Sequence, residues 1–138
     1  MPRLDYFVVA QGISVDQSTN SLSIFNVLEE LRSPGFPILI PMLSAISVWI
    51  PEAEDDGRDF QCILRVTLPG EESRDIAHNF VIGRTRHRLI QRLQGVPIQR
   101  AGEIRMQLLL NGATMHDYVV PAIQDDSVPT SNVSSIPA

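Results

Sequence analysis

The sequence predicts an all-β protein: an antiparallel β-sandwich of about eight short strands with a flexible C-terminal tail. Several segments alternate apolar and polar residues with the two-residue period of a strand, polar turn residues separate them, and no segment has the periodicity of a long helix. A chain of 138 residues is long enough to bury the core of one domain. We expect the sandwich domain over residues 1–123 and a disordered tail over residues 124–138, which are rich in Ser, Pro and Asp.

The clearest local pattern is the dipeptide Asn111-Gly112 between two alternating runs. Asn-Gly is preferred at the centre of a two-residue type I′ turn, because both positions need positive φ. The sequence therefore predicts a β-hairpin with strands over residues 104–110 and 113–120.

Pairing outward from this turn places Leu110 opposite Ala113 and Met106 opposite Asp117. Asp117 is then the one acid on an otherwise apolar face of the hairpin. Either a bulge near His116 directs Asp117 outward, or this carboxylate lies at a wet rim of the core.

The remaining strands follow from alternation between turn residues. Trp49 lies on the opposite side of its strand from Ile46, Val48 and Ile50, and is expected to cover the outer face. Because Gly95 and Pro97 weaken a central strand, residues 89–94 are either a strand or a short helix. Strands are predicted over residues 4–13, 21–31, 42–50, 60–68, 78–87 and 88–98.

The composition limits the cellular locations and the kinds of partner that we expect for this protein. No apolar run approaches the ~18 residues of a membrane span, the N-terminus lacks a secretion-signal pattern, and the single Cys62 forms no internal disulfide. We therefore expect a cytoplasmic protein without membrane contact, with Cys62 as a core residue. The net charge of −5 gives no field that would attract nucleic acid.

A strip of arginines is one candidate binding surface. Arg84, Arg86 and Arg88 alternate directly after an apolar run, and Arg92 follows. A bulge at Gly83 would shift the register and present these arginines outward, where they could bind an anion or the carboxylates of a partner. The alternative is that they pair with the protein's own acids or protect a sheet edge.

An acidic loop over residues 52–59 is a second candidate. It carries five carboxylates, the ligand type that calcium prefers, although no second acidic loop and no EF-hand spacing accompany it. The default interpretation is a solvated loop, and we assign no metal ligand and no cofactor. The acids are Glu52, Glu54, Asp55, Asp56 and Asp59.

No catalytic pattern is present. His78, His87 and His116 are far apart in sequence, without metal-ligand spacing. His116 and Asp117 are adjacent, so on a regular strand they point to opposite faces and cannot form a dyad. No nucleotide-binding or hydrolase motif occurs, so we expect a protein that is not an enzyme.

Residues 21–37 combine Ile24-Phe25-Asn26 with a later Gly35-Phe36-Pro37. With residues 10–17 and the strand over 102–112, this pattern resembles a family of small uncharacterised bacterial β-sandwich proteins, a domain of unknown function, over residues 4–123. The resemblance implies the sandwich fold. It implies no activity, cofactor or site.

The sequence thus favours a non-enzymatic interaction module that presents a strand face to a protein partner or to a second copy. Phe25, Ile63 and Leu109 lie opposite the inward sets of their strands and are candidate interface residues, unless a second buried face covers them. The alternative function is binding of a small anionic ligand or a metal by the arginine strip or the acidic loop.

Overall fold

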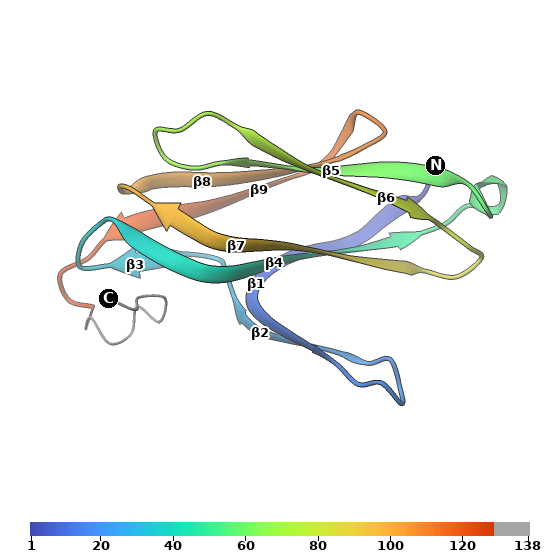
Figure 1. Ribbon diagram of the computed structural model, residues 1–138, viewed down its shortest axis with the longest axis horizontal. Coiled ribbons are helices and arrows are strands. Elements are labelled where there is room, and N and C mark those ends of the chain that lie inside the picture. Colours follow the sequence, from blue (N-terminus) through green and yellow to red (C-terminus); the bar gives the residue numbers. More distant parts are fainter. Residues whose placement is uncertain (129–138) are drawn as a thin grey trace.

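The computed structural model describes residues 1–128 as nine β-strands in two packed sheets (Figure 1). Sheet A has the strand order β2-β1-β4-β7, and sheet B has the order β3-β9-β8-β5-β6. The strands are β1 (Arg3–Val15), β2 (Leu22–Val27), β3 (Leu31–Ser33), β4 (Ile38–Ile50), β5 (Asp59–Thr67), β6 (Arg74–Val81), β7 (His87–Ile98), β8 (Gly102–Leu110) and β9 (Ala113–Gln124), with a 3₁₀ turn η1 (Ala53–Asp55).

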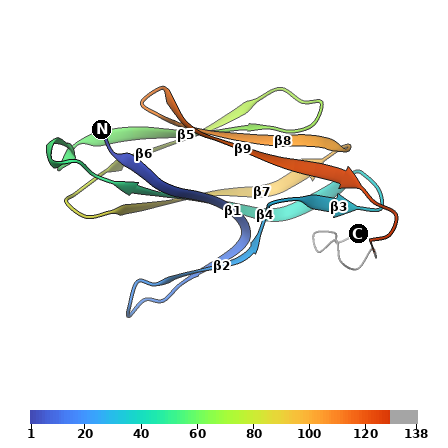
Figure 2. The same cartoon turned by 180° about the vertical axis from the view of Figure 1, so that it is seen from behind.

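The predicted sandwich is confirmed, with nine strands rather than about eight. The short strand β3 was not predicted, because its identity depends on a parallel pairing with the distant strand β9 (Figure 2). All other neighbouring strands pair antiparallel. Within the described residues, no helix is long and apolar enough to cross a membrane.

The core lies between the two sheets and follows the predicted alternation of β5. Phe60, Cys62 and Leu64 are buried, which confirms the core position of the cysteine. The expectation for Trp49 was wrong: its side chain is fully buried in the core and stacks on Phe80, with the ring centroids 6.3 Å apart. Both sides of β4 are apolar, so alternation alone did not indicate which side faces sheet B.

The Asn-Gly hairpin forms as predicted at its tip, where Leu110 pairs with Ala113. A register shift between Leu108 and Leu109 then moves every later pair by one residue, so Met106 faces Tyr118 instead of Asp117. This bulge confirms the first of the two alternatives for Asp117, whose carboxylate lies outside the core.

The region after β6 differs from its prediction. β6 ends at Val81 and β7 begins at His87, so Arg84 and Arg86 lie in the connection between two strands and not on a strand. Residues 89–94 are strand and not helix. Pro97 is tolerated because β7 is an edge strand of sheet A.

The hairpin of β1 and β2 projects from the sandwich (Figure 1). We call residues 12–25 the arm. It starts where Asn26 adopts a positive φ of 56° and interrupts the ladder, and it projects from sheet A on the side opposite to sheet B. At its tip, the carboxylate of Asp16 accepts a hydrogen bond from the backbone of Ser18 at 2.9 Å, which is the turn chemistry expected for residues 16–20.

The predicted tail lies mostly outside the described residues. Gln124 is the last residue of β9, and the backbone N–H of Asp125 donates to the oxygen of Ser33 at 2.8 Å. The prediction of a disordered tail falls mainly on residues 129–138, which lie outside the described residues.

Candidate interaction surface

Two of the four candidate arginines are neutralised within the protein. The guanidinium of Arg84 lies 3.0 Å from Asp56, and that of Arg86 lies 2.5 Å from Asp5. Both pairs are largely exposed, so each contributes little to stability. Their charges are nevertheless compensated, and the two side chains do not form a continuous strip with the others.

The other two arginines lie on β7 and carry uncompensated charge. Arg88 donates to the side-chain and backbone oxygens of Asn20 at the tip of the arm, at 3.3 and 2.9 Å. Arg92 makes no hydrogen bond or ion pair from its side chain within residues 1–128. Neither guanidinium therefore has a carboxylate partner in the described chain.

The acidic loop is held by contacts of its own. Asp55 is buried, and its carboxylate accepts a hydrogen bond from the backbone of Glu52 at 2.7 Å. The amino group of Met1 lies 3.2 Å from both Glu52 and Asp55, and their hydrogen bonds raise its pKa. Asp56 of the acidic loop and Arg84 form an ion pair beside a surface pocket of about 310 Å³.

The three histidines lie on different strands. His87 is half-buried and stacks on Phe80, with ring centroids 4.6 Å apart. His116 and Asp117 occupy consecutive positions of β9, and His78 lies on β6. Across residues 1–128, no group of three or more His, Cys, Asp or Glu side chains is arranged to hold a metal ion.

The outer face of sheet B mixes ion pairs with apolar side chains. Arg65 and Asp75 form a cross-strand ion pair at 2.8 Å, and Arg105 binds Asp117 at 3.2 Å. Val81 and Val119 lie on the same face and are 56% and 39% exposed. Such a face is typical of the solvated side of an antiparallel sheet.

Two of the candidate interface residues lie within this face. Ile63 is half-buried and pairs with both Leu109 and Ala77 on the neighbouring strands. Leu109 is only 7% exposed, so the expectation that it is exposed was wrong. Side-by-side packing with Ile63 explains the result, because residues on one face of adjacent strands shield each other.

The outer face of sheet A differs in its charges. The pairings of β1, β4 and β7 place nine side chains on it in three rows, and none of the nine is acidic. We call these nine residues the outer face. They are Tyr6, Val48 and Arg88; Val8, Ile46 and Ile90; and Ala10, Ser44 and Arg92.

The central row of the outer face is entirely apolar. Ile46 pairs with Val8 and Ile90 and is fully buried although it faces away from the core, and its outer-face neighbours Ala10, Ser44 and Val48 are buried as well. Arg88 and Arg92 lie on the two sides of Ile90 along β7. The rise per residue of a strand separates Arg88 and Arg92 by about 13 Å. The apolar Ile90 therefore lies between two positively charged residues.

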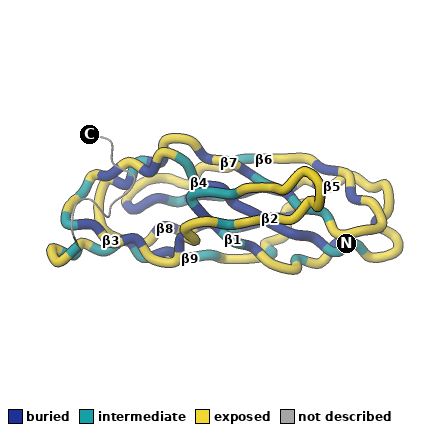
Figure 3. Tube along the Cα trace, turned by 90° about the horizontal axis from the view of Figure 1, so that it is seen from below, coloured by how far each residue is buried: buried dark blue, intermediate teal, exposed yellow. Residues whose placement is uncertain are grey.

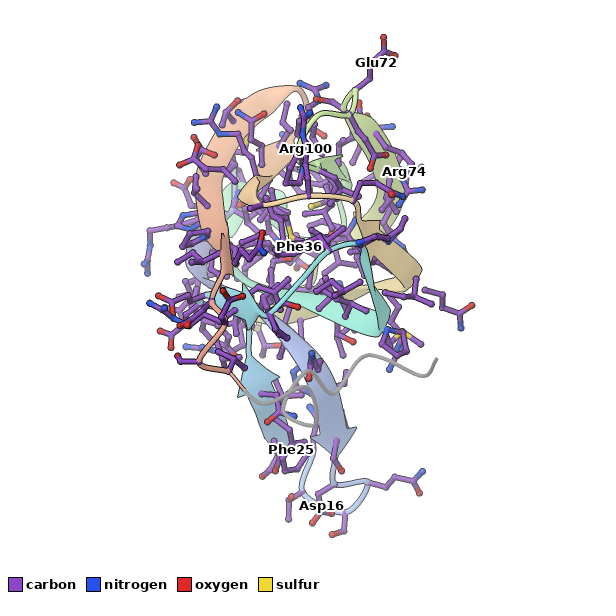
Figure 4. All side chains as sticks on the ribbon, turned by 90° about the vertical axis from the view of Figure 1, so that its left-hand side faces the viewer. Asp16, Phe25, Phe36, Glu72, Arg74 and Arg100 are labelled. Carbon is purple, nitrogen blue, oxygen red and sulfur yellow. The ribbon has the colours of Figure 1, made fainter. Side chains whose placement is uncertain are left out.

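Large exposed apolar side chains adjoin this face. Tyr6 is 37% exposed, Phe25 54% and Val27 45%. Val27 pairs with Ala10 and Phe25 pairs with Gly12, so both lie beside β1. Figure 4 places Phe25 on the arm beyond the body of the sandwich, and Figure 3 shows the arm as mainly exposed. Of the three candidate interface residues, Phe25 has the accessibility that a contact requires.

The outer face of sheet A was not anticipated from the sequence. The available signal was the run of residues 43–49, which is buried at every position in the structure. A strand with one solvated face alternates, whereas a strand covered on both faces does not. The run was therefore compatible with a second protected surface behind the core.

The chain matches the sequence profile of one protein family. Residues 5–122 match the profile of a protein family described as a family of unknown function (DUF6941). No curated protein matches the chain.

Proposed function

The chain belongs to DUF6941, a family of unknown function, and we propose that it is a non-enzymatic module that binds another protein through the outer face of sheet A. The observation that carries the proposal is the contrast between the two sheets. The outer face of sheet B carries two cross-strand ion pairs, whereas sheet A presents the exposed Tyr6 and an Arg92 without an ion-pair partner among residues 1–128, with Phe25 and Val27 exposed beside them.

The composition of the surface fits protein recognition. Interfaces are enriched in aromatic residues and arginine, and an exposed apolar patch rimmed by polar groups commonly marks a contact site. Tyr6 and Phe25 supply aromatic rings, while Arg88 and Arg92 supply guanidiniums. In a protein of net charge −5, this local excess of positive charge favours a partner segment that carries carboxylates.

The alternative, binding of a small anion or a metal, has less support. Arg84 and Asp56 already satisfy each other, and Arg86 is paired with Asp5. Arg88 already donates to the backbone oxygen of Asn20, and Arg92 lies about 13 Å further along β7. We also propose a cytoplasmic location, which the single unpaired Cys62 supports.

The test is affinity capture from the host cell with matched charge reversals. Arg92→Glu places an acid on the outer face, and Arg105→Glu makes the same change on the outer face of sheet B. A protein retained by the wild type and by Arg105→Glu, but lost with Arg92→Glu, would support the proposal. Equal retention by both variants would contradict it, provided that both unfold at the wild-type temperature.

A further inference from the structure

The arm leaves one strand edge unpaired. β2 is the terminal strand of sheet A and hydrogen bonds only to β1. Among residues 1–128 it has no second neighbour in the sheet. Its outer edge therefore presents backbone N–H and C=O groups that can pair with another strand.

The other three edges of the two sheets carry the features that normally prevent such pairing. β7 has Arg88, Arg92 and Pro97, β6 has Arg74 and Asp75, and β3 is three residues long. Charged side chains, proline and shortness each discourage strand addition. β2, with the sequence Leu-Ser-Ile-Phe-Asn-Val, has neither a charged residue nor a proline.

The arm has one apolar side, on which Ile13, Leu22 and Ile24 are half-buried and Val15 is exposed. Its pairing places Ile13 beside Ile24 and Val15 beside Leu22, so one side of the hairpin is wholly apolar. None of these four residues is buried. A two-stranded hairpin is marginally stable in water, and additional strands or a packing layer are needed to stabilise its apolar side.

The hydrogen bonding at the tip fixes which backbone groups of β2 face outward. The N–H of Asp16 donates to the oxygen of Ser21, so Val15 and Leu22 form a pair without mutual hydrogen bonds. Because bonded and non-bonded pairs alternate, Ile24 also directs its N–H and C=O away from β1. Ile24 is thus the central residue of the unpaired edge.

We propose that β2 pairs antiparallel with β2 of a second copy, about a twofold axis at Ile24, and joins the two sheets A into one eight-stranded sheet. Each Ile24 then donates its N–H to the oxygen of the other. A twofold axis suits an antiparallel edge, because the same segment supplies both sides of the contact. Ser23 faces Phe25 of the second copy, and no charge opposes a like charge.

This inference goes beyond the proposed function, since it uses the edge of β2 and not Arg92 on the outer face of sheet A. Because the shared ladder is short, we expect a dimer in the micromolar range and not a permanent one. The arm projects from sheet A on the side opposite to sheet B (Figure 1).

The first test is the molecular mass in solution, measured by sedimentation between about 1 and about 200 µM of the full chain. Wild type should shift from monomer to dimer over this range. Ile24→Pro removes the outward N–H without removing a bond to β1, and should stay monomeric with at least tenfold weaker association. Ile24→Val keeps that N–H and should dimerise like the wild type.

The second test fixes the register. Paired residues at a bonded position lie about 5.5 Å apart, within reach of a disulfide. Oxidised Ile24→Cys should give a covalent dimer, whereas Ser14→Cys on β1 should not, because two further strand spacings separate it from its mate. The native Cys62 is fully buried and does not interfere.

A wild type that remains monomeric throughout the concentration range overturns the inference. A dimer that forms equally well with Ile24→Pro also overturns it. So does a disulfide cross-link that forms with Ser14→Cys but not with Ile24→Cys. These results are separate from the partner capture, which depends on Arg92. Monomeric Ile24→Pro that still captures the partner would show that the two surfaces act independently.

Discussion

The guanidinium of Arg88 on β7 donates hydrogen bonds to Asn20 at the tip of the arm, at 2.9 Å to its backbone oxygen. The two residues are 68 positions apart in the chain. The contact therefore joins the first hairpin to the opposite edge of the same sheet. It also explains why Arg88 is half-buried although it faces solvent.

Arg88→Ala should loosen the arm without unfolding the sandwich. The hydrogen bonds are exposed, so we expect a loss of less than about 1 kcal/mol in the free energy of unfolding. Amide hydrogen exchange of residues 12–25 should accelerate, while that of β5 and β8 stays unchanged. Arg92→Ala is the matched control and should leave exchange in the arm as in the wild type. Equal exchange rates in the two variants would contradict the role assigned to Arg88.

Trp49→Ala should be strongly destabilising. Trp49 is fully buried, stacks on Phe80, and donates its indole N–H to the hydroxyl of Ser47 at 3.0 Å. Removing a buried aromatic side chain of this size costs about 3–5 kcal/mol. Phe25→Ala, at an exposed aromatic, should change the free energy of unfolding by less than about 1 kcal/mol. Chemical denaturation of the two variants measures both values, and a small loss for Trp49→Ala would contradict its core position.

Stability should fall as the pH drops below the ordinary titration range of histidine. Burial, and to a lesser extent the charge of His78, lower the pKa of His87 from its usual 6.5. The unfolded chain therefore binds a proton more readily than the folded one. The contribution of His87 is complete above pH 6.5 and is lost as the pH falls from 6.5 toward the lowered pKa.

The measurement is urea denaturation of the wild type and of His87→Phe at about pH 7.5 and about pH 5.5. The phenylalanine keeps a ring against Phe80 but cannot be protonated. The wild type should lose more stability between the two pH values than this variant does. Parallel losses in both proteins would show that His87 is not responsible.

Cys62 should be unreactive in the folded protein. Burial raises the pKa of its thiol to about 12, so little thiolate exists near neutral pH. A thiol reagent such as dithionitrobenzoate should label the chain only after unfolding, at a rate set by opening of the core. The variant Ile24→Cys, whose new thiol lies on the arm, is a positive control and should be labelled in the native state. Rapid native labelling of the wild type would contradict the burial of Cys62.

The elements that were predicted correctly depend on neighbours in sequence. The alternation of β5 identifies Cys62 as a core residue, and Asn111-Gly112 locates the tip of the last hairpin. Positive φ is confirmed for both residues of that turn. Local conformational preferences and the two-residue period are sufficient for such predictions.

The elements that were missed depend on residues far apart in sequence. The three arginines at residues 84–88 looked like one strip, yet Arg84 binds Asp56 across 28 positions and Arg86 binds Asp5 across 81. The spacing of arginines in the sequence cannot show which acidic side chains the fold places next to them. The bulge at Leu108 and the burial of Leu109 likewise depend on how adjacent strands meet.

The sequence by itself determined the all-β class, the main strands, the hairpin tip and the buried cysteine, because alternation and turn chemistry act between close neighbours. Within residues 1–128, the tertiary structure decided which side chains share the outer face of sheet A, which two of the four candidate arginines lack a carboxylate partner, and which edge of β2 stays unpaired. These properties arise when distant strands are placed side by side, and ion pairing and edge pairing depend on that placement.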